Sequence, residues 1–383
     1  MTTSFGRVFL LWGAGLGAAA QYAKVSVIFD QLPDLYPDAG AWLGWAVSLV
    51  GLVGIIFGVA AGFLVARLRY KRALIWALWL GAGISALQGL GLPLWGFLTL
   101  RAIEGLSHLG LVVAAPTLIA QLSAPQHRGF TLTLWGTFFG VAFAVLTWGG
   151  LPMVAAYGVT SLFWAHGLYM AVLAVILTFS LQFLPENTPI TRFSLRQLIK
   201  DHVAIYRSPR VAAAGMGWLF YTFCFVSVLT VMPPFLAPEY RAIVMGAMPL
   251  ASIVSSMTLG VYLLRSMSAV DVVVLGFGSS LAVMGWLWVS PGHAWACLAL
   301  AATLGLIQGA SFAAVPQLND SAATQAQANG AMAQMGNLGN ALGTPVIVAG
   351  LLWLGYAALP IFVGTALALG LCTHLVLARL RNT

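Results

Sequence analysis

Apolar stretches of about 20 residues recur along the whole chain, and short polar stretches separate them. A helix of that length rises about 30 Å, which matches the hydrocarbon core of a bilayer. Each stretch therefore predicts a membrane-spanning helix. The twelve predicted spans lie near residues 8–29, 41–66, 73–92, 94–118, 130–150, 160–184, 211–235, 242–264, 270–290, 294–316, 329–353 and 359–378.

The longest polar interruption is PENTPITRFSLRQLIKDHVAIYRSPR, residues 185–210, which carries prolines near both of its ends. Six predicted spans precede it and six follow it. The pattern thus predicts an all-α membrane protein with two six-helix bundles. The expected domains are an N-terminal bundle at 1–184, a cytoplasmic linker at 185–210 and a C-terminal bundle at 211–383.

The composition supports this class of protein. Of 383 residues, 61% are hydrophobic and only 7% are charged, whereas soluble domains carry about 25% charged residues. The first apolar run is too long for the apolar region of a signal peptide, so we interpret it as the first span. The three cysteines lie far apart in apolar segments, which predicts neither a disulfide framework nor a metal motif.

The net charge of +8 is a topology signal rather than a nucleic-acid footprint, because Lys and Arg accumulate in cytoplasmic loops. With the N-terminus inside, one side of the membrane receives 14 of the 17 basic residues. Both termini are then cytoplasmic, and the expected partner is the lipid bilayer, not nucleic acid. These basic residues are Arg7, Arg67, Arg69, Lys71, Arg72, Arg128, Arg192, Arg196, Lys200, Arg207, Arg210, Arg265, Arg379 and Arg381.

The segment LRAIEGLSHLG in the fourth span places Arg101, Glu104 and His108 on one helix face, at i, i+3 and i+7. A charge at mid-membrane costs roughly 2.5–3.5 kcal/mol on insertion scales, so such groups are expected to face a cavity or a partner. Glu104 or His108 is the expected proton carrier. The structural alternatives are a bracing Arg101–Glu104 ion pair and a histidine that hydrogen-bonds across helices.

In the first span, Gln21 and Lys24 lie one turn apart at a depth similar to that of Glu104. Lys24 and Glu104 are therefore expected to meet, and Gln21, Lys24, Arg101 and His108 are candidate substrate-binding residues. The alternative is that Lys24 extends to the outer headgroups.

Two further polar sets lie in the second half of the chain. Trp218, Tyr221 and Thr222 form an aromatic and hydroxyl face in the seventh span, and Asn337 and Asn340 lie on one face in the eleventh. All five are candidate substrate-binding residues, since indole, phenol and amide groups need polar partners. The alternatives are a packing surface for the aromatic rings and helix–helix hydrogen bonds for the amides.

Three motifs resemble those of the major facilitator superfamily. GFLVARLRYKRAL (62–74) resembles its signature between spans 2 and 3, although Ala66 replaces the acidic residue and Arg69 replaces the second glycine. Arg101 and Gly105 match its span-4 pattern, and GTFFGVAFA (136–144) keeps the glycine spacing of the antiporter motif without its proline. The resemblance implies a secondary transporter working by alternating access around a midplane site. Its gating loop would comprise Arg67, Arg69, Lys71 and Arg72.

Longer phrases resemble one branch of that superfamily, which contains bacterial riboflavin permeases and the copper importers that supply cytochrome oxidase assembly. These phrases are WGAGLGAAAQYAKVSVIFD, GWLFYTFCFVSVLTVMPPFL and PQLNDSAATQAQANGAMAQMGNLGNALGTP. The branch implies uptake across a bacterial inner membrane, and we expect a monomer.

Riboflavin fits the residue inventory better than copper. Trp218 and Tyr221 can stack on a flat ring, while amide side chains can bond its carbonyl and ribityl groups. Copper needs soft ligands paired on one helix face. Four residues before Met257, where a histidine ligand would be expected, the chain has Ile253. Copper stays as the alternative because Met245/Met248 and Met332/Met335 are pairs on one helix face.

Other classes find less support. The chain carries no GxxxxGKS loop, no GxSxG elbow and no HExxH, so we expect neither an enzyme nor a cofactor or metal centre. No repeated ring of charge predicts a channel. Another small organic solute or drug permease, and a sensor on a transporter scaffold, remain as further alternatives.

Overall fold

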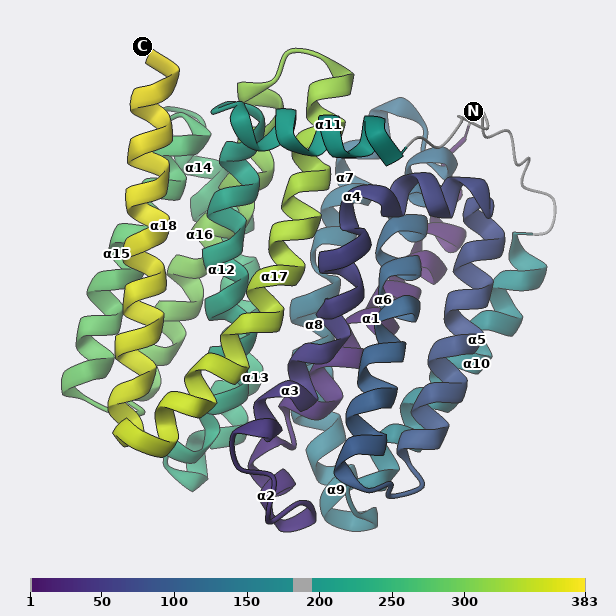
Figure 1. Cartoon of the computed structure of the whole chain (residues 1–383), viewed down its shortest axis with the longest axis vertical. Coiled ribbons are helices and arrows are strands. Elements are labelled where there is room, and N and C mark those ends of the chain that lie inside the picture. The colour runs from purple at the N-terminus through teal and green to yellow at the C-terminus, as the bar shows by residue number, and fades with distance from the viewer. Residues whose placement is uncertain (1, 182–194, 383) are drawn as a thin grey trace. The chain divides into compact units, whose positions relative to one another are not determined.

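The structure is a computed structural model that describes residues 2–181 and 195–382, with backbone alone at residues 59–64, 66–67, 195–199, 201, 322–323 and 382. The described chain is helical throughout, without strands (Figure 1). In the first half the helices are α1 (Phe5–Ser26), α2 (Leu32–Leu35), α3 (Leu43–Ser48), α4 (Leu52–Arg67), α5 (Tyr70–Gln88), α6 (Leu94–Leu122), α7 (Arg128–Gly136), α8 (Phe138–Val145), α9 (Leu151–Tyr157) and α10 (Thr160–Ser180).

In the second half the helices are α11 (Leu195–Arg207), α12 (Val211–Val231), α13 (Pro238–Ser255), α14 (Val261–Leu263), α15 (Ala269–Val289), α16 (Ala294–Leu318), α17 (Ala322–Leu354) and α18 (Ala358–Asn382). Two π-helical turns, Leu146–Gly150 and Ser256–Gly260, join α8 to α9 and α13 to α14. Each of these joined sets makes one span.

The twelve predicted spans are confirmed as helices. Nine stretches of the described chain are long and apolar enough to cross a membrane, and the last, Thr324–Arg381, contains both α17 and α18. α1 and α5 complete the set of twelve among the described residues. α17 begins at Ala322, earlier than predicted, because the Ser321 hydroxyl caps its first turn by accepting from the Thr324 amide.

Contacts divide the chain into two compact units, Met1–Ile28 with Ala60–Phe193 and Phe29–Val59 with Ser194–Thr383. This grouping differs from the expected domains at residues 29–59, which lie with the second unit because α3 packs on α17. A Cβ atom at Gly44 would lie only 2.6 Å from Pro345 Cα, so glycine permits this close approach. Of the expected linker, residues 185–194 lie outside the described residues, and the next stretch forms α11.

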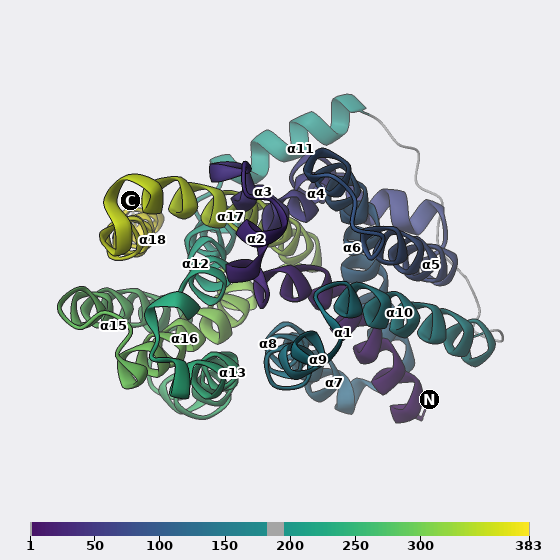
Figure 2. The same ribbon diagram turned by 90° about the horizontal axis from the view of Figure 1, so that it is seen from below.

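In the first unit, α1 is surrounded by α6, α8 and α10 (Figure 2). Its glycines allow close packing: a Cβ atom at Gly15 would lie 2.6 Å from the Trp135 ring, and one at Gly17 would collide with Met170. Small residues at helix contacts are the usual basis of packing in lipid, where apolar surfaces gain little from meeting one another. α1 is thereby held where its polar residues reach three neighbouring helices.

In the second unit, α12 lies among α16, α17 and α18 (Figure 2). Gly336, Gly339 and Gly343 line the face of α17 that touches α12, and a Cβ atom at Gly339 or Gly343 would overlap α12 backbone oxygens. The same unit includes α11, which lies across the ends of α12 and α17 (Figure 1).

α11 contacts α17 through the buried Ile205, which packs in a cluster with Ala328 and Met332, and through the phenol of Tyr206. The Tyr206 hydroxyl donates to Gln334 Oε1 at 2.7 Å, and Gln334 Nε2 donates to the Ile55 carbonyl at 3.2 Å. Burial raises the pKa of Tyr206 to about 12, so the phenol stays protonated and able to donate at physiological pH. Gln334 thus ties both α11 and α4 to α17.

The connection between α4 and α5 has an unusual backbone. Arg69 has φ 67° and ψ 125°, and among the described residues it is the only non-glycine with positive φ. An L-residue is strained there, whereas glycine is not. The sequence motif carries glycine at this position in the superfamily that it resembles, and the backbone conformation explains that preference.

We expect Arg69→Gly to raise the free energy of unfolding by about 1 kcal/mol, because relief of backbone strain exceeds the entropy that glycine adds to the unfolded chain. Arg72→Gly is the matched control, since Arg72 lies in the first turn of α5 and glycine is unfavourable in a helix. Melting temperatures of the purified variants in detergent test this, and a fall in both variants would contradict the strain at Arg69.

Candidate functional site

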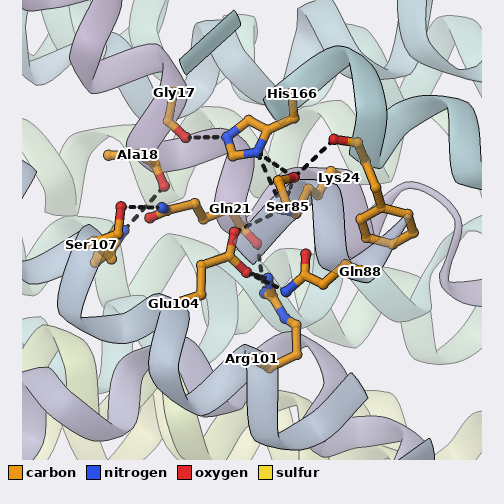
Figure 3. Close-up of polar contacts among 12 residues, drawn as sticks. Gly17, Ala18, Gln21, Lys24, Ser85, Gln88, Arg101, Glu104, Ser107 and His166 are labelled. Atoms are coloured by element: carbon orange, nitrogen blue, oxygen red, sulfur yellow. Dashed lines mark hydrogen bonds and ion pairs between the residues drawn. The ribbon is translucent and has the colours of Figure 1, made fainter. Parts of the chain in front are cut away.

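A cluster of polar and charged side chains lies in the interior of the first unit, beside its apolar core (Figure 3). Four helices supply it, α1, α5, α6 and α10, and each contributes polar residues from an otherwise apolar sequence. The members are Gln21, Lys24, Ser85, Gln88, Arg101, Glu104, Ser107, His108 and His166.

Lys24 lies at the centre of the cluster and uses all three hydrogens of its ammonium group. Nζ donates to Glu104 Oε1 at 2.7 Å, to Ser85 Oγ at 2.8 Å and to His166 Nδ1 at 3.2 Å. It also lies 5.4 Å from the centre of the Phe163 ring. The side chain is fully buried, so the alternative in which Lys24 extends to the headgroups is not realised.

Glu104 receives charged and polar donors on both carboxylate oxygens (Figure 3). Oε1 accepts from Lys24, while Oε2 accepts from Arg101 and, at 2.8 Å, from Gln88 Nε2. Two cations and an amide therefore stabilise the carboxylate in its ionised form. The expected meeting of Lys24 with Glu104 and the expected Arg101–Glu104 pair are both present.

Arg101 also attaches α6 to α1. Its Nη2 donates to the Gln21 carbonyl at 2.6 Å, and the Gln21 side chain donates back to Ser107 Oγ on α6 at 2.8 Å. Ser107 in turn donates to the Ala77 carbonyl on α5 at 2.6 Å. The first two bonds join α1 to α6 and the third joins α6 to α5, so the cluster also fixes these three helices against one another.

His166 bridges α10 to α1. Its Nε2 lies 3.0 Å from the Gly17 carbonyl, which can only accept, so Nε2 carries the proton. Nδ1 is then the acceptor that faces Lys24 and, at 2.9 Å, Ser85 Oγ. His166 is therefore neutral in this arrangement.

His108 does not bond to Glu104, although the two lie one turn apart. Its Nδ1 lies 3.1 Å from the Ala18 carbonyl, and its ring packs edge-on against Tyr22 with centroids 5.1 Å apart. This geometry matches the alternative in which a histidine hydrogen-bonds across helices.

Sequence reasoning missed Ser85, Gln88, Ser107 and His166, although each contributes a bond to the cluster. The signal was present: Ser85 and Gln88 are one turn apart in ISALQGL, within the third span. A comparison of the membrane depth of all polar residues, including the neutral ones, would have predicted that these four lie near Glu104.

The candidates in the second unit form a separate group. The centroid of the Trp218 ring lies 4.6 Å from that of Tyr221 and 5.0 Å from that of Phe312. The Tyr221 ring in turn stacks on Phe225. Thr222 donates to carbonyls of its own helix. The four rings therefore form one packed group on α12 and α16, in which Tyr221 and Phe225 are buried and Phe312 is exposed.

The two asparagines lie on α17 in different environments. Asn337 donates to the Ala333 carbonyl at 2.8 Å and packs against Gly54. Asn340 accepts at its backbone carbonyl from Ser48 at 3.1 Å, and its Oδ1 has no hydrogen-bond partner among the described residues. Both asparagines contact the second predicted span. This matches the alternative in which the amides serve helix–helix contacts and not substrate binding.

The expected gating loop is described only in part. Arg69 and Arg72 are exposed and Lys71 is half-buried, whereas the side chain of Arg67 lies outside the described residues. Among the residues that the structure describes, no group of three His, Cys, Asp or Glu could hold a metal ion.

The charge arrangement predicts unequal effects of two substitutions. We expect Glu104→Gln to lower the free energy of unfolding by about 3–5 kcal/mol, because it leaves Lys24 and Arg101 buried without their anion. Lys24→Met is expected to cost less, since Arg101 and Glu104 still neutralise each other. Melting temperatures in detergent measure both, and an equal or larger loss for Lys24→Met would contradict this account of the cluster.

Comparisons with known proteins bear on the whole chain. The family model described as Major Facilitator Superfamily matches residues 11–344. Over 157 residues the chain is 26% identical to the "Inner membrane transport protein YajR" of Escherichia coli (strain K12), a match that covers 40% of this chain. It covers 34% of that protein, so this chain spans about a third of the length of the curated relative it matches.

Proposed function

Because the chain belongs to the major facilitator superfamily, we propose that it is a secondary transporter that moves a small polar organic solute by alternating access. The observation that carries the proposal is the buried cluster around Glu104. Ionisable residues inside a membrane protein are costly and mark solute or ion pathways. Three charged side chains with 0% exposure in one helical unit satisfy that description.

We propose riboflavin as the solute to test first. Trp218 is half-buried and Phe312 is 49% exposed, so these two rings offer aromatic surface, while the buried Tyr221 packs against Trp218. A flat heteroaromatic ring is well matched to such a surface. Asn340 Oδ1, which lacks a partner among the described residues, could accept from a ribityl hydroxyl. Gln21, Lys24, Arg101, His108, Thr222 and Asn337 remain in the proposed set from the sequence.

The proposed location is a bacterial inner membrane, with both termini cytoplasmic and the monomer as the working form. The asymmetry of the basic residues supports the orientation. The relative from Escherichia coli is described as an inner membrane protein. As a multi-pass member of this superfamily, the chain has the lipid bilayer as its medium and a small molecule as its substrate.

Uptake of labelled riboflavin by a bacterial riboflavin auxotroph without its own permease tests the proposal. We expect saturable uptake, with Trp218→Ala raising the half-saturation concentration about 2- to 10-fold through loss of an aromatic contact worth about 0.5–1.5 kcal/mol. Trp353→Ala is the control, because Trp353 is 88% exposed; its uptake should match that of the unsubstituted protein.

No uptake above the empty vector, with the protein present in the membrane, would rule out riboflavin. Copper accumulation in the same cells would then test the alternative from the same branch. If Trp218→Ala and Trp353→Ala change the half-saturation concentration equally, the aromatic rings of α12 do not bind the solute.

A further inference from the structure

The buried cluster carries more positive than negative charge. The chain has nine acidic residues, and Glu104 is the only one in the interior of a span. Lys24 and Arg101 contribute two positive charges against one carboxylate, and His166 is neutral in its observed bonding. The other acids lie in first helical turns, on α11 or in connecting segments: Asp30, Asp34, Asp38, Glu186, Asp201, Glu239, Asp271 and Asp320.

In the part of the chain whose side chains are described, Glu104 is the carboxylate that pairs with both Lys24 and Arg101. Asp30 lies 3.9 Å from Arg241, outside the cluster. The side chains of Lys24, Arg101 and Glu104 are fully buried, so in this conformation a bulky anion cannot reach them. A proton is small enough to change the charge of such a sealed cluster.

Among the groups of the cluster, Lys24 is the one whose titration brings the net charge to zero. Arg101 does not lose its proton, and protonation of Glu104, His108 or His166 would add positive charge. Release from Tyr22 would leave a phenolate oxygen that has no hydrogen-bond partner among the described residues. Release from Lys24 leaves a neutral amine beside a neutral Arg101–Glu104 pair.

We propose that Lys24 is the proton-carrying residue of this protein, releasing its proton in one state of the transport cycle and rebinding it in another. The assignment differs from the expected carriers, Glu104 and His108. Glu104 instead serves as the fixed counterion that Arg101 neutralises when Lys24 is uncharged.

Proton release from Lys24 would alter the packing of helices. A neutral amine has two hydrogens, whereas Lys24 now donates to three acceptors. The longest of these bonds, at 3.2 Å to His166 Nδ1, is the one expected to be lost. Ser85 Oγ lies 2.9 Å from the same nitrogen, and its hydroxyl could donate there by giving up its 3.0 Å bond to the Phe163 carbonyl. The protonation state of Lys24 is thereby linked to the attachment of α1 to α10.

The titratable groups that face Lys24 come from two other helices. α6 presents Arg101, Glu104 and His108, and α10 presents His166. α5 presents only the neutral Ser85 and Gln88, α8 and the Leu146–Gly150 turn carry no titratable side chain, and Arg128 on α7 bonds to carbonyls at the end of α6. On α1 itself, Tyr22 lies nearest to Lys24 in sequence.

The chain offers a direct test because it contains three lysines, Lys24, Lys71 and Lys200. Lys71→Arg/Lys200→Arg keeps every charge and leaves Lys24 as the single lysine, with the cluster untouched. This variant, labelled with ¹³Cε-lysine and placed in lipid nanodiscs, would give one lysine signal to follow by NMR between about pH 5 and pH 10.

We expect that signal to pass from the ammonium to the amine position in one step. A Lys24 signal that stays at the ammonium position over the whole range would overturn the proposal. Labelled unsubstituted protein provides the reference, because the signals of Lys71 and Lys200 then appear in the same spectrum.

The role of Lys24 in coupling rests on the proposed transport function, whereas its titration does not. In vesicles, we expect Lys24→Met to lower the riboflavin accumulation driven by an imposed pH gradient at least about 10-fold more than it lowers riboflavin counterflow. Lys200→Met is the control, because Lys200 is exposed on α11, outside both the cluster and the expected gating loop. Accumulation by Lys24→Met equal to that of the control would overturn the coupling role. Absence of riboflavin movement in all proteins would instead reject riboflavin as the solute, and the NMR titration would still decide the proton site.

Discussion

A charged group that is buried away from water is stable only when other groups of the protein neutralise it and hydrogen-bond to it. The side chain that depends most on such partners in this protein is Glu104. The carboxylate has 0% exposure and accepts from Lys24, Gln88 and Arg101. The two cationic donors make further hydrogen bonds: Arg101 donates to the Gln21 carbonyl, and Lys24 donates to Ser85 and His166. One buried anion therefore organises side chains from four helices. Breaking such a network by removing one member is costly because the remaining charges stay buried.

The same low-dielectric surroundings explain why the rest of the fold depends on small residues. Apolar surfaces gain little by meeting in lipid, so close backbone approach and dispersion contacts must hold the helices together. Gly15 and Gly17 allow α1 to approach its neighbours, and Gly339 and Gly343 do so for α17 against α12. The polar cluster is thus placed by a tightly packed apolar frame, and it fixes the register of α1 within that frame.

Much of this organisation follows from the sequence, since hydropathy alone locates all twelve spans and helical spacing places Arg101 beside Glu104. The meeting of Lys24 with Glu104 also follows, because equal depth on two spans can be calculated from the rise per residue. Ser85, Gln88 and His166 were not predicted, since an isolated neutral polar residue gives no sign of which neighbouring helix it faces. The bond of His108 to Ala18 was missed for a related reason: a backbone carbonyl competes for a histidine without leaving any mark in the sequence.

The grouping of residues 29–59 with the second unit gives the chain an unusual connectivity. The polypeptide leaves the first unit after Ile28, contributes α3 to the other unit, and returns at Ala60 before it reaches the linker. The chain consequently passes from one unit to the other three times: after Ile28, after Val59 and in the linker. A cut in the linker would leave the helices of the first unit on one fragment, but it would separate α2 and α3 from the rest of the second unit. α3 therefore packs on a helix that lies far later in the sequence, so a fragment that ends in the linker would expose the face of α3 that α17 covers.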